Sequence, residues 1–260
     1  IFAGDLLNQC IGSGFALRGQ DIPFYGLYGA CSTMAESLSL AALMIDGKFA
    51  SHAAALTSSH FCSAERQYRT PLEYGGQRTP TAQWTVTGSG CTILAAQGNG
   101  PRVTHVTTGK IVDKGIKDAN NMGAAMAPAA YETIKAHLQD TGRRPSSYDL
   151  ILTGDLGQLG RDIVLDLFRR DGVDLSNLAD CGTMIYDLEG QDVHCGGSGC
   201  GCSAVVLNGY LMDGLKKGRW KRLLFCGTGA LLSPTSTQQG ESIPAICHAA
   251  ALAAPGCETA

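Results

Sequence analysis

The chain is poor in charged residues and has no concentration of charge of either sign. Of its 260 residues, 17% are Asp, Glu, Lys or Arg, and the formal net charge is −3. No basic run or stripe occurs, which argues against a nucleic-acid-binding surface. No apolar run approaches the length of a membrane span, and we recognise no signal peptide. We therefore expect no nucleic-acid partner, and association with a membrane only through other proteins.

Cysteine is abundant, but its pattern argues against a disulfide scaffold. The count of 11 is odd, the chain is long, and several cysteines lie inside predicted strands or helices. This pattern favours a reduced, cytosolic setting. Cys195, Cys200 and Cys202 cluster around a glycine turn, yet no second Cys or His pair lies at zinc-ligand spacing. We expect small core residues there, with no metal site and no cofactor.

Cys31 is the most informative residue of the chain. It follows a predicted strand at 21–27 and precedes a proline-free stretch at 34–45. This order predicts a strand, a tight glycine turn and a buried helix over 32–45. Unpaired backbone N–H groups and the positive end of the helix dipole favour the thiolate of a cysteine at a helix N-terminus. Cys31 is therefore a candidate nucleophile or anion-binding point.

The pattern around Cys31 recurs later in the chain. Each copy has a Gly-Asp-Leu sequence, then a cysteine, then a glycine at the same distance from that cysteine: Gly4, Cys31 and Gly47 in one, Gly154, Cys202 and Gly218 in the other. A repeat of this length predicts duplicated halves packed face to face. Coincidence in a chain rich in Gly and Ala is the alternative. We place the two halves at residues 1–118 and 119–260.

Predicted strands alternate with predicted helices, which indicates an α/β fold with at least partly parallel sheets. Besides the elements near Cys31, we expect strands at 53–57, 91–94, 102–112, 150–153 and 222–226, and helices at 128–138, 161–170 and 203–217. A long polar segment at 58–83 is predicted to be a functional loop, and 227–239 a second loop. Because residues 1–5 resemble the end of a strand inside a domain, we expect an N-terminal part of the first half to be missing.

Several motifs resemble known protein families. Three of them resemble the thiolase and ketoacyl synthase superfamily: Gly29-Ala30-Cys31-Ser32-Thr33, Val86-Thr87-Gly88-Ser89-Gly90 and the helix after Cys202. Longer motifs, spread over essentially the whole chain, are similar to a family of thiolase-like sporulation proteins of endospore-forming bacteria: Ala3-Gly4-Asp5-Leu6-Leu7-Asn8-Gln9, Thr57-Ser58-Ser59-His60, Ala64-Glu65-Arg66-Gln67, Glu73-Tyr74-Gly75-Gly76-Gln77, Met126-Ala127-Pro128-Ala129-Ala130, Cys195-Gly196-Gly197-Ser198-Gly199-Cys200 and Leu231-Leu232-Ser233-Pro234-Thr235.

This resemblance implies a five-layered αβαβα fold of two pseudo-equivalent halves, with a further N-terminal segment in the family. It implies binding of dipicolinic acid (pyridine-2,6-dicarboxylate), free or as its calcium chelate, for uptake into the developing spore. Membrane proteins of the same sporulation system would be the partners, and they would hold the protein on the cytoplasmic side of the spore inner membrane. Related folds form homodimers, so a homodimer is expected by analogy.

Condensing enzymes of this superfamily need more than a nucleophilic cysteine. A His, with a second His or Asn, polarises the thioester carbonyl and stabilises developing negative charge. At the corresponding turns this chain has Gly154-Asp155-Leu156-Gly157 and Gly197-Ser198-Gly199-Cys200. The nucleophile position is kept while the other catalytic positions are vacated. We expect a non-catalytic binding protein; the alternative is an acyl-CoA condensing or acyl-transfer enzyme that uses Cys31.

A planar dianion such as dipicolinate needs hydrogen-bond donors at two ends and a flat slot for its ring. The predicted ligand-binding residues are Cys31, Ser32, His60, Arg66, Asp155, Gly199, Gly227, Thr228 and Gly229. Backbone N–H groups at a helix N-terminus and in a glycine turn would serve as donors, and Asp155 would meet calcium or a ligand water. The structural alternatives are an inert buried thiol at Cys31, a structural histidine at His60 and an ion pair at Arg66.

Overall fold

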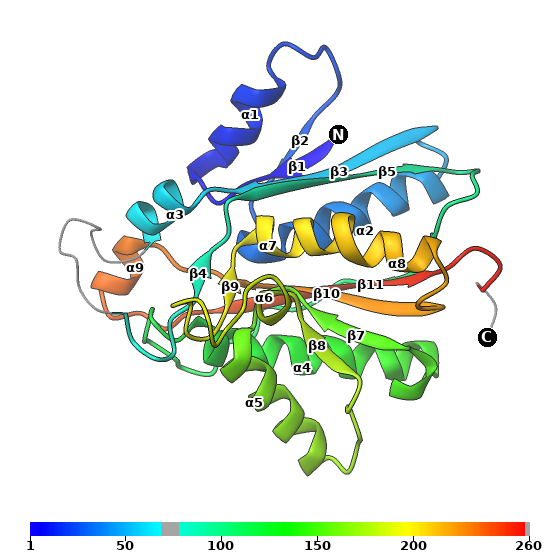
Figure 1. Ribbon diagram of the computed structural model, residues 1–260. Helices are drawn as coiled ribbons and strands as arrows, with labels where there is room; N and C mark the ends of the chain where they lie inside the picture. Colours follow the sequence, from blue (N-terminus) through cyan, green and yellow to red (C-terminus); the bar gives the residue numbers. More distant parts are fainter. Residues whose placement is uncertain (69–77, 258–260) are drawn as a thin grey trace.

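Five layers, alternating helix and sheet, stack in the computed structural model (Figure 1). It describes residues 1–68 and 78–257. The helices that form the layers are α1 (Ile11–Leu17) outside the first sheet, α2 (Thr33–Asp46), α7 (Cys200–Val205), the π-helical segment η5 (Val206–Leu211) and α8 (Met212–Lys216) between the sheets, and α4 (Met122–Thr141) and α5 (Gly157–Arg170) outside the second sheet. The predicted αβαβα fold is confirmed.

The two sheets have equivalent strand orders, and the second sheet has one additional strand at its edge. The first runs β2 (Tyr25–Leu27), β1 (Phe2–Gly4), β3 (His52–Ser59) and β5 (Gly88–Ala95). The second runs β8 (Leu178–Asp180), β7 (Leu150–Thr153), β10 (Arg222–Ala230), β11 (Ala245–Ala253) and β6 (Arg102–Thr107). In each sheet the first three strands are parallel, and β5 or β11 is antiparallel to them. β6 precedes the boundary predicted after residue 118, yet it pairs with β11 of the second sheet.

Short elements complete the chain and lie mainly at the ends of these strands. They are η1 (Asn8–Cys10), η2 (Ala30–Ser32), α3 (Phe61–Tyr68), β4 (Trp84–Thr85), η4 (Pro145–Ser147), α6 (Cys181–Met184), β9 (Gly197–Ser198) and α9 (Pro234–Gln238). β4 pairs with β9, so segments more than a hundred residues apart meet beside the ends of α2 and α7.

Apolar side chains fill both faces of the second sheet. Leu224, Cys226 and Ala249 face α4 and α5, whereas Leu223 and Phe225 pack with α2 and α7 between the sheets. Burial of this apolar surface is the main stabilising contribution to the layered fold. Small residues allow close approach of the layers: a Cβ added to Gly123 of α4 would lie 2.5 Å from the carbonyl oxygen of Leu156.

Two helical segments differ from the predictions. Residues 61–68 of the predicted loop form α3, while residues 69–77 of that loop lie outside the described residues. α4 begins at Met122, six residues before the predicted start, because the side chain of Asn121 caps it by accepting from the N–H of Ala124. Pro128 therefore lies inside the helix instead of in its first turn, at the loss of one backbone hydrogen bond.

The last two strands also depart from the predictions. The strand predicted at 222–226 continues to Ala230, so residues 227–230 of the predicted loop are part of β10. β11 was not predicted, because six of its nine residues are Ala or Cys and lack the β-branched signature of strands. Both segments lie in the centre of the second sheet, where tertiary packing outweighs local propensity.

All 11 cysteines are free, and Cys195, Cys200 and Cys202 are buried as predicted. Across the described ranges, no helix combines the length and hydrophobicity needed to cross a bilayer.

Candidate functional site

Cys31 lies in the turn between β2 and α2, where the backbone is constrained. Ala30 has a φ of 53°, in the left-handed region that alanine rarely adopts, so the surroundings hold this turn. The carbonyl of Ala30 accepts from the hydroxyl of Thr33, and the N–H and hydroxyl of Ser32 both donate to the carbonyl of Gly29. These bonds fix the direction in which the Cys31 side chain leaves the backbone.

Gly227 and Gly229 bring β10 against this turn. A Cβ on Gly229 would lie 2.6 Å from the carbonyl oxygen of Gly29, and one on Gly227 would lie 2.7 Å from the Cβ of Ala35. Side chains at these two positions would push the strand away from the head of α2. The predicted glycine turn at 227–229 is therefore wrong: these residues belong to a strand that packs tightly on the Cys31 turn.

Asp155 follows β7 and is completely buried beside Cys31. Its Oδ1 accepts from the Thr228 hydroxyl at 3.0 Å. Its Oδ2 accepts from the Gly199 N–H at 2.8 Å and from the Ser198 hydroxyl at 3.4 Å. The Cys31 thiol lies close enough to this carboxylate for each group to affect the pKa of the other. Burial raises the pKa of Asp155, while the hydrogen bonds from Gly199, Thr228 and Ser198 act in the opposite direction.

The environment of Cys31 opposes formation of a thiolate. Burial raises the pKa of its thiol well above the ordinary range, and the nearby negative charge of Asp155 raises the pKa further. The helix N-terminus therefore does not activate this cysteine as the sequence pattern predicted.

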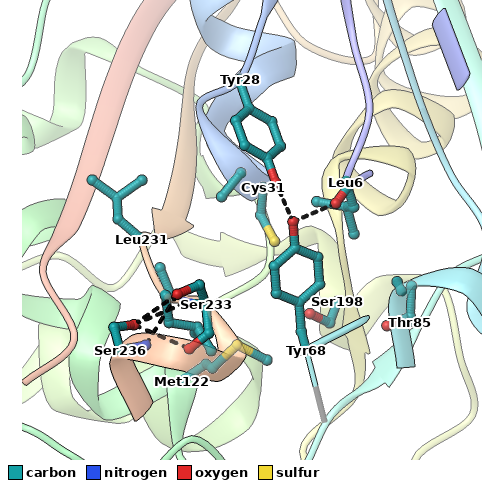
Figure 2. Close-up of a pocket in the computed structure, with 14 residues that line it drawn as sticks. Leu6, Tyr28, Cys31, Tyr68, Thr85, Met122, Ser198, Leu231, Ser233 and Ser236 are labelled. Atoms are coloured by element: carbon teal, nitrogen blue, oxygen red, sulfur yellow. Dashed lines mark hydrogen bonds between the residues drawn. The ribbon is translucent and has the colours of Figure 1, made fainter. Parts of the chain in front are cut away.

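A cavity of about 350 Å³ opens at Cys31 (Figure 2). Its apolar lining comes from Leu6, Ala30, Ala64, Met122, Ala230, Leu231 and Leu232. Its polar lining comes from Tyr28, Cys31, Tyr68, Thr85, Ser198, Ser233 and Ser236. Among these described residues there is no Lys, Arg, His, Asp or Glu, so the wall is neutral and offers hydroxyl groups for hydrogen bonding. A cavity of this size, largely apolar with a few polar groups, is typical of a small-molecule site.

A network of hydroxyl and amide groups fixes the two tyrosines. The hydroxyls of Tyr28 and Tyr68 are 2.6 Å apart, and Tyr68 also donates to the carbonyl of Leu6 (Figure 2). Asn8 accepts from Tyr28 and from Gln67, both at 2.7 Å. Burial and the contact with Tyr28 raise the pKa of Tyr68, so its hydroxyl stays protonated. Both rings are thus held by bonds at their tips.

Thr85 connects the cavity wall to a buried charge. Its hydroxyl donates to Oε1 of Glu65 at 2.9 Å, and Arg78 forms an ion pair with the same oxygen at 3.1 Å. The guanidinium of Arg78 lies 4.3 Å from the centre of the Trp84 ring, which in turn stacks on Phe61. The ion pair therefore offsets the negative charge behind Thr85.

The structure brings together most of the predicted site residues. Cys31 lines the cavity, and Ser32, Asp155, Gly199, Gly227, Thr228 and Gly229 lie directly behind it. His60, after β3, and Arg66, on α3, are exposed and do not line the cavity. Within residues 1–68 and 78–257, no three His, Cys, Asp or Glu side chains are grouped to hold a metal ion.

Most residues of the cavity wall are not among the predicted site residues. Tyr28 carries a usable signal, because it precedes the Gly-Ala-Cys turn at the end of a strand. Ser198 and Ser233 lie in motifs that carry the family resemblance. Tyr68 and Met122 have no such signal, because Tyr68 lies in a segment predicted to be a loop and Met122 precedes the predicted start of its helix.

Comparisons with known proteins agree with this fold. The sequence matches the family model described as Stage V sporulation protein AD (SpoVAD) over residues 1–253. It is 48% identical over 249 residues to Stage V sporulation protein AD of Bacillus subtilis (strain 168), a match that covers 95% of this chain and 73% of that protein.

Solved condensing enzymes share the architecture at low sequence identity. The 3-oxoacyl-(acyl carrier protein) synthase III of Pseudomonas aeruginosa PAO1 is 13% identical, with a TM-score of 0.59 and coverage of 98% of this chain and 76% of that one. The tetronic acid condensing enzyme AbyA1 is 15% identical, with a TM-score of 0.60 and coverage of 97% and 77%. These likenesses show the thiolase-like fold alone. By its sequence, the chain belongs to the Stage V sporulation protein AD family.

Proposed function

We propose that the cavity at Cys31 binds dipicolinic acid, free or as its calcium chelate, for uptake into the developing spore, and that the protein catalyses no reaction on it. Membership of a sporulation protein family supports the biological setting. The resemblance described above supports the choice of ligand.

One observation carries the non-catalytic part of the proposal. The charge that acts on the Cys31 thiol comes from the buried carboxylate of Asp155, where a condensing enzyme would need a catalytic histidine. A carboxylate cannot donate a hydrogen bond to an oxyanion unless it is protonated. The described lining of the cavity contains no imidazole that could take this role.

The shape and polarity of the cavity support a small planar acid as the ligand. In Figure 2, Ser233 and Ser236 lie on one side of Tyr68, and Thr85 and Ser198 lie on the other. Hydroxyl groups thus lie toward two ends, where a molecule with two carboxylates requires donors. To donate to it, Thr85 would exchange its bond to Glu65, and Ser198 its bond to Asp155, for a bond to the ligand. Leu231 and the ring of Tyr68 provide apolar surface for a flat ring between them.

Calorimetric titration with dipicolinate tests this proposal. We expect Cys31→Phe to fill the cavity and lower the affinity at least about tenfold, the effect of losing roughly 1.4 kcal/mol of binding free energy. Cys91→Phe, at an exposed position on β5, is the matched control and should bind normally. Undiminished affinity of Cys31→Phe would place the ligand elsewhere. Titrations with and without calcium identify which form is bound.

A second candidate function is acyl transfer through Cys31. The apolar wall formed by Leu6, Ala64 and Leu232 next to a thiol favours it, because an acyl chain would fit against such a surface. Incubation with acyl-CoA, followed by mass spectrometry of the intact protein, distinguishes acyl transfer from dipicolinate binding. We expect no adduct; acylation at Cys31 would establish the enzyme instead.

The partners are part of the same proposal. Membrane proteins of the sporulation system would carry the compound across the membrane, and this chain would supply the binding step as a homodimer. Co-purification from sporulating cells and sedimentation of the isolated protein test these two points. A monomer at micromolar concentration would remove the dimer from the proposal.

A further inference from the structure

Tyr68, on α3, supplies an aromatic ring to the cavity wall. Of the lining residues that the structure describes, only Tyr28 and Tyr68 are aromatic, and Tyr28 is 47% exposed. The ring of Tyr68 lies below Cys31 in the view of Figure 2. It packs on a small apolar cluster made of Leu6, Cys31, Ala64 and Cys200. The cluster supports part of the ring, and the rest of the ring borders the cavity.

The hydroxyl of Tyr68 has no capacity left for a ligand. A phenol hydroxyl has one proton and two lone pairs. The proton is donated to the carbonyl of Leu6, and the oxygen contacts the Tyr28 hydroxyl at 2.6 Å and Nε2 of Gln67 at 3.0 Å. A bound molecule therefore meets the ring of Tyr68 and not its hydroxyl. Because these bonds already hold the ring in place, little side-chain freedom is lost on binding.

A fixed aromatic ring distinguishes ligands that the rest of the cavity treats alike. The hydroxyl groups of the wall can bond to the carboxylates of any small diacid, whether its ring is flat or puckered. Aromatic rings stack on one another with an attraction beyond that of their buried area, and a puckered ring cannot lie flat on the same surface. Met122, which also lines the cavity, has a flexible side chain that adapts to a flat ring.

We propose that Tyr68 is the specificity-determining residue of the cavity, and that its fixed ring selects planar aromatic acids over saturated acids of the same charge. This inference rests on the proposed binding function and deepens it, because it assigns recognition of the ligand ring to one side chain. The hydroxyl groups of the wall would then recognise only the carboxylates.

A matched pair of ligands tests this proposal. Benzene-1,3-dicarboxylate and cis-cyclohexane-1,3-dicarboxylate carry the same two charges at the same ring positions, but only the first has a flat ring. Calorimetric titration gives the ratio of the two dissociation constants. We expect the wild-type protein to prefer the aromatic acid, and Tyr68→Leu to reduce this preference about fivefold, the size of one aromatic stacking contact. An equal preference in the two proteins would overturn the proposal.

Two further variants separate the ring from other effects of the substitution. Tyr68→Phe keeps the ring and removes the hydroxyl, so it should retain the wild-type preference. A loss in Tyr68→Phe as large as in Tyr68→Leu would contradict the proposal, because it would assign selectivity to the hydroxyl. Tyr210→Leu is the matched control, since Tyr210 is an exposed tyrosine of η5 that does not line this cavity. It should leave the preference unchanged.

Proton NMR of the ligand covers the case in which Tyr68→Leu does not fold. The ring current of an aromatic side chain shifts protons that lie over its face upfield. We expect the ring protons of benzene-1,3-dicarboxylate to move upfield on binding to the wild-type protein and to Tyr68→Phe. Binding without an upfield shift would show that no ring lies against the ligand, which would overturn the proposal.

The same titrations with dipicolinate keep this inference apart from the proposed function. Binding of dipicolinate, with an unchanged preference in Tyr68→Leu, would overturn the inference alone. Binding of benzene-1,3-dicarboxylate but not of dipicolinate would overturn the proposed ligand, while the preference ratio would still decide the role of Tyr68. Binding of neither aromatic acid would overturn both.

Discussion

Cys31 and Cys202 occupy matching places in the two halves, yet their surroundings differ. Cys31 lines the cavity and is followed by α2, which is regular over 14 residues. Cys202 is completely buried in α7, which continues through the π-helical segment η5 into α8. The side chain of Asn208 in η5 accepts from Thr92 of β5 and so ties this helix to the first sheet. The cysteine of the first copy thus lines the cavity, whereas the cysteine of the second copy packs in the core.

The two Gly-Asp turns diverge in the same manner. Asp5 accepts from the N–H of Leu7 and from the N–H and hydroxyl of Ser13, so it stabilises its own chain segment at the start of α1. Asp155 accepts instead from Ser198, Gly199 and Thr228, which lie on two other chain segments behind the cavity. The two turns share a sequence, but only the second one connects separate segments at the cavity.

The largest expected effect concerns these two carboxylates. Asp155→Ala leaves the buried donors of Ser198, Gly199 and Thr228 without their acceptor, and we expect it to lower the free energy of unfolding by about 4 kcal/mol. Asp5→Ala should lower it by about 2 kcal/mol, because only Ser13 loses its acceptor in the interior, whereas the N–H of Leu7 is partly exposed and can bond to water. Urea denaturation of both variants measures the difference. Equal losses would show that bonds between separate chain segments matter no more than local ones.

A smaller effect is expected for the two cysteines. Cys202→Met adds volume beside Gly197 and the carbonyl of Gly154, and overpacking there should lower the free energy of unfolding by about 2 kcal/mol. Cys31→Met can place its extra atoms in the cavity, so we expect a loss below about 1 kcal/mol. Chemical denaturation of the pair provides the test. A larger loss for Cys31→Met would mean that the cavity does not accept the longer side chain.

Much of the layered fold could be predicted because the signals are local. The strand at 150–153, the glycine turn before Cys31 and the helix that ends before Gly47 each follow from a few adjacent residues. β11 could not be predicted in this way, since its alanines form a strand only when β6 and β10 flank them. The turn predicted at Gly227 and Gly229 was wrong, because these two glycines allow β10 to pack closely against the Cys31 turn.

The site could be predicted only in part, for a similar reason. Cys31 and Asp155 stand out by sequence position and by resemblance to condensing enzymes. Their proximity depends on how the chain packs, and burial together with the charge of Asp155 reverses the effect that the helix N-terminus alone would have on the pKa of the thiol. Tyr68, Met122 and Ser236 come from three distant segments that converge only in the folded chain.

The burial of the Cys31 thiol, which raises its pKa, also bears on resistance to oxidation. Peroxides attack the deprotonated form of cysteine, and the ladder from sulfenic to sulfonic acid begins there. A sulfur that keeps its proton is a poor target even where a cavity leads to it. Oxidative damage should therefore begin at the exposed Cys62 and Cys91 and spare the interior of the cavity.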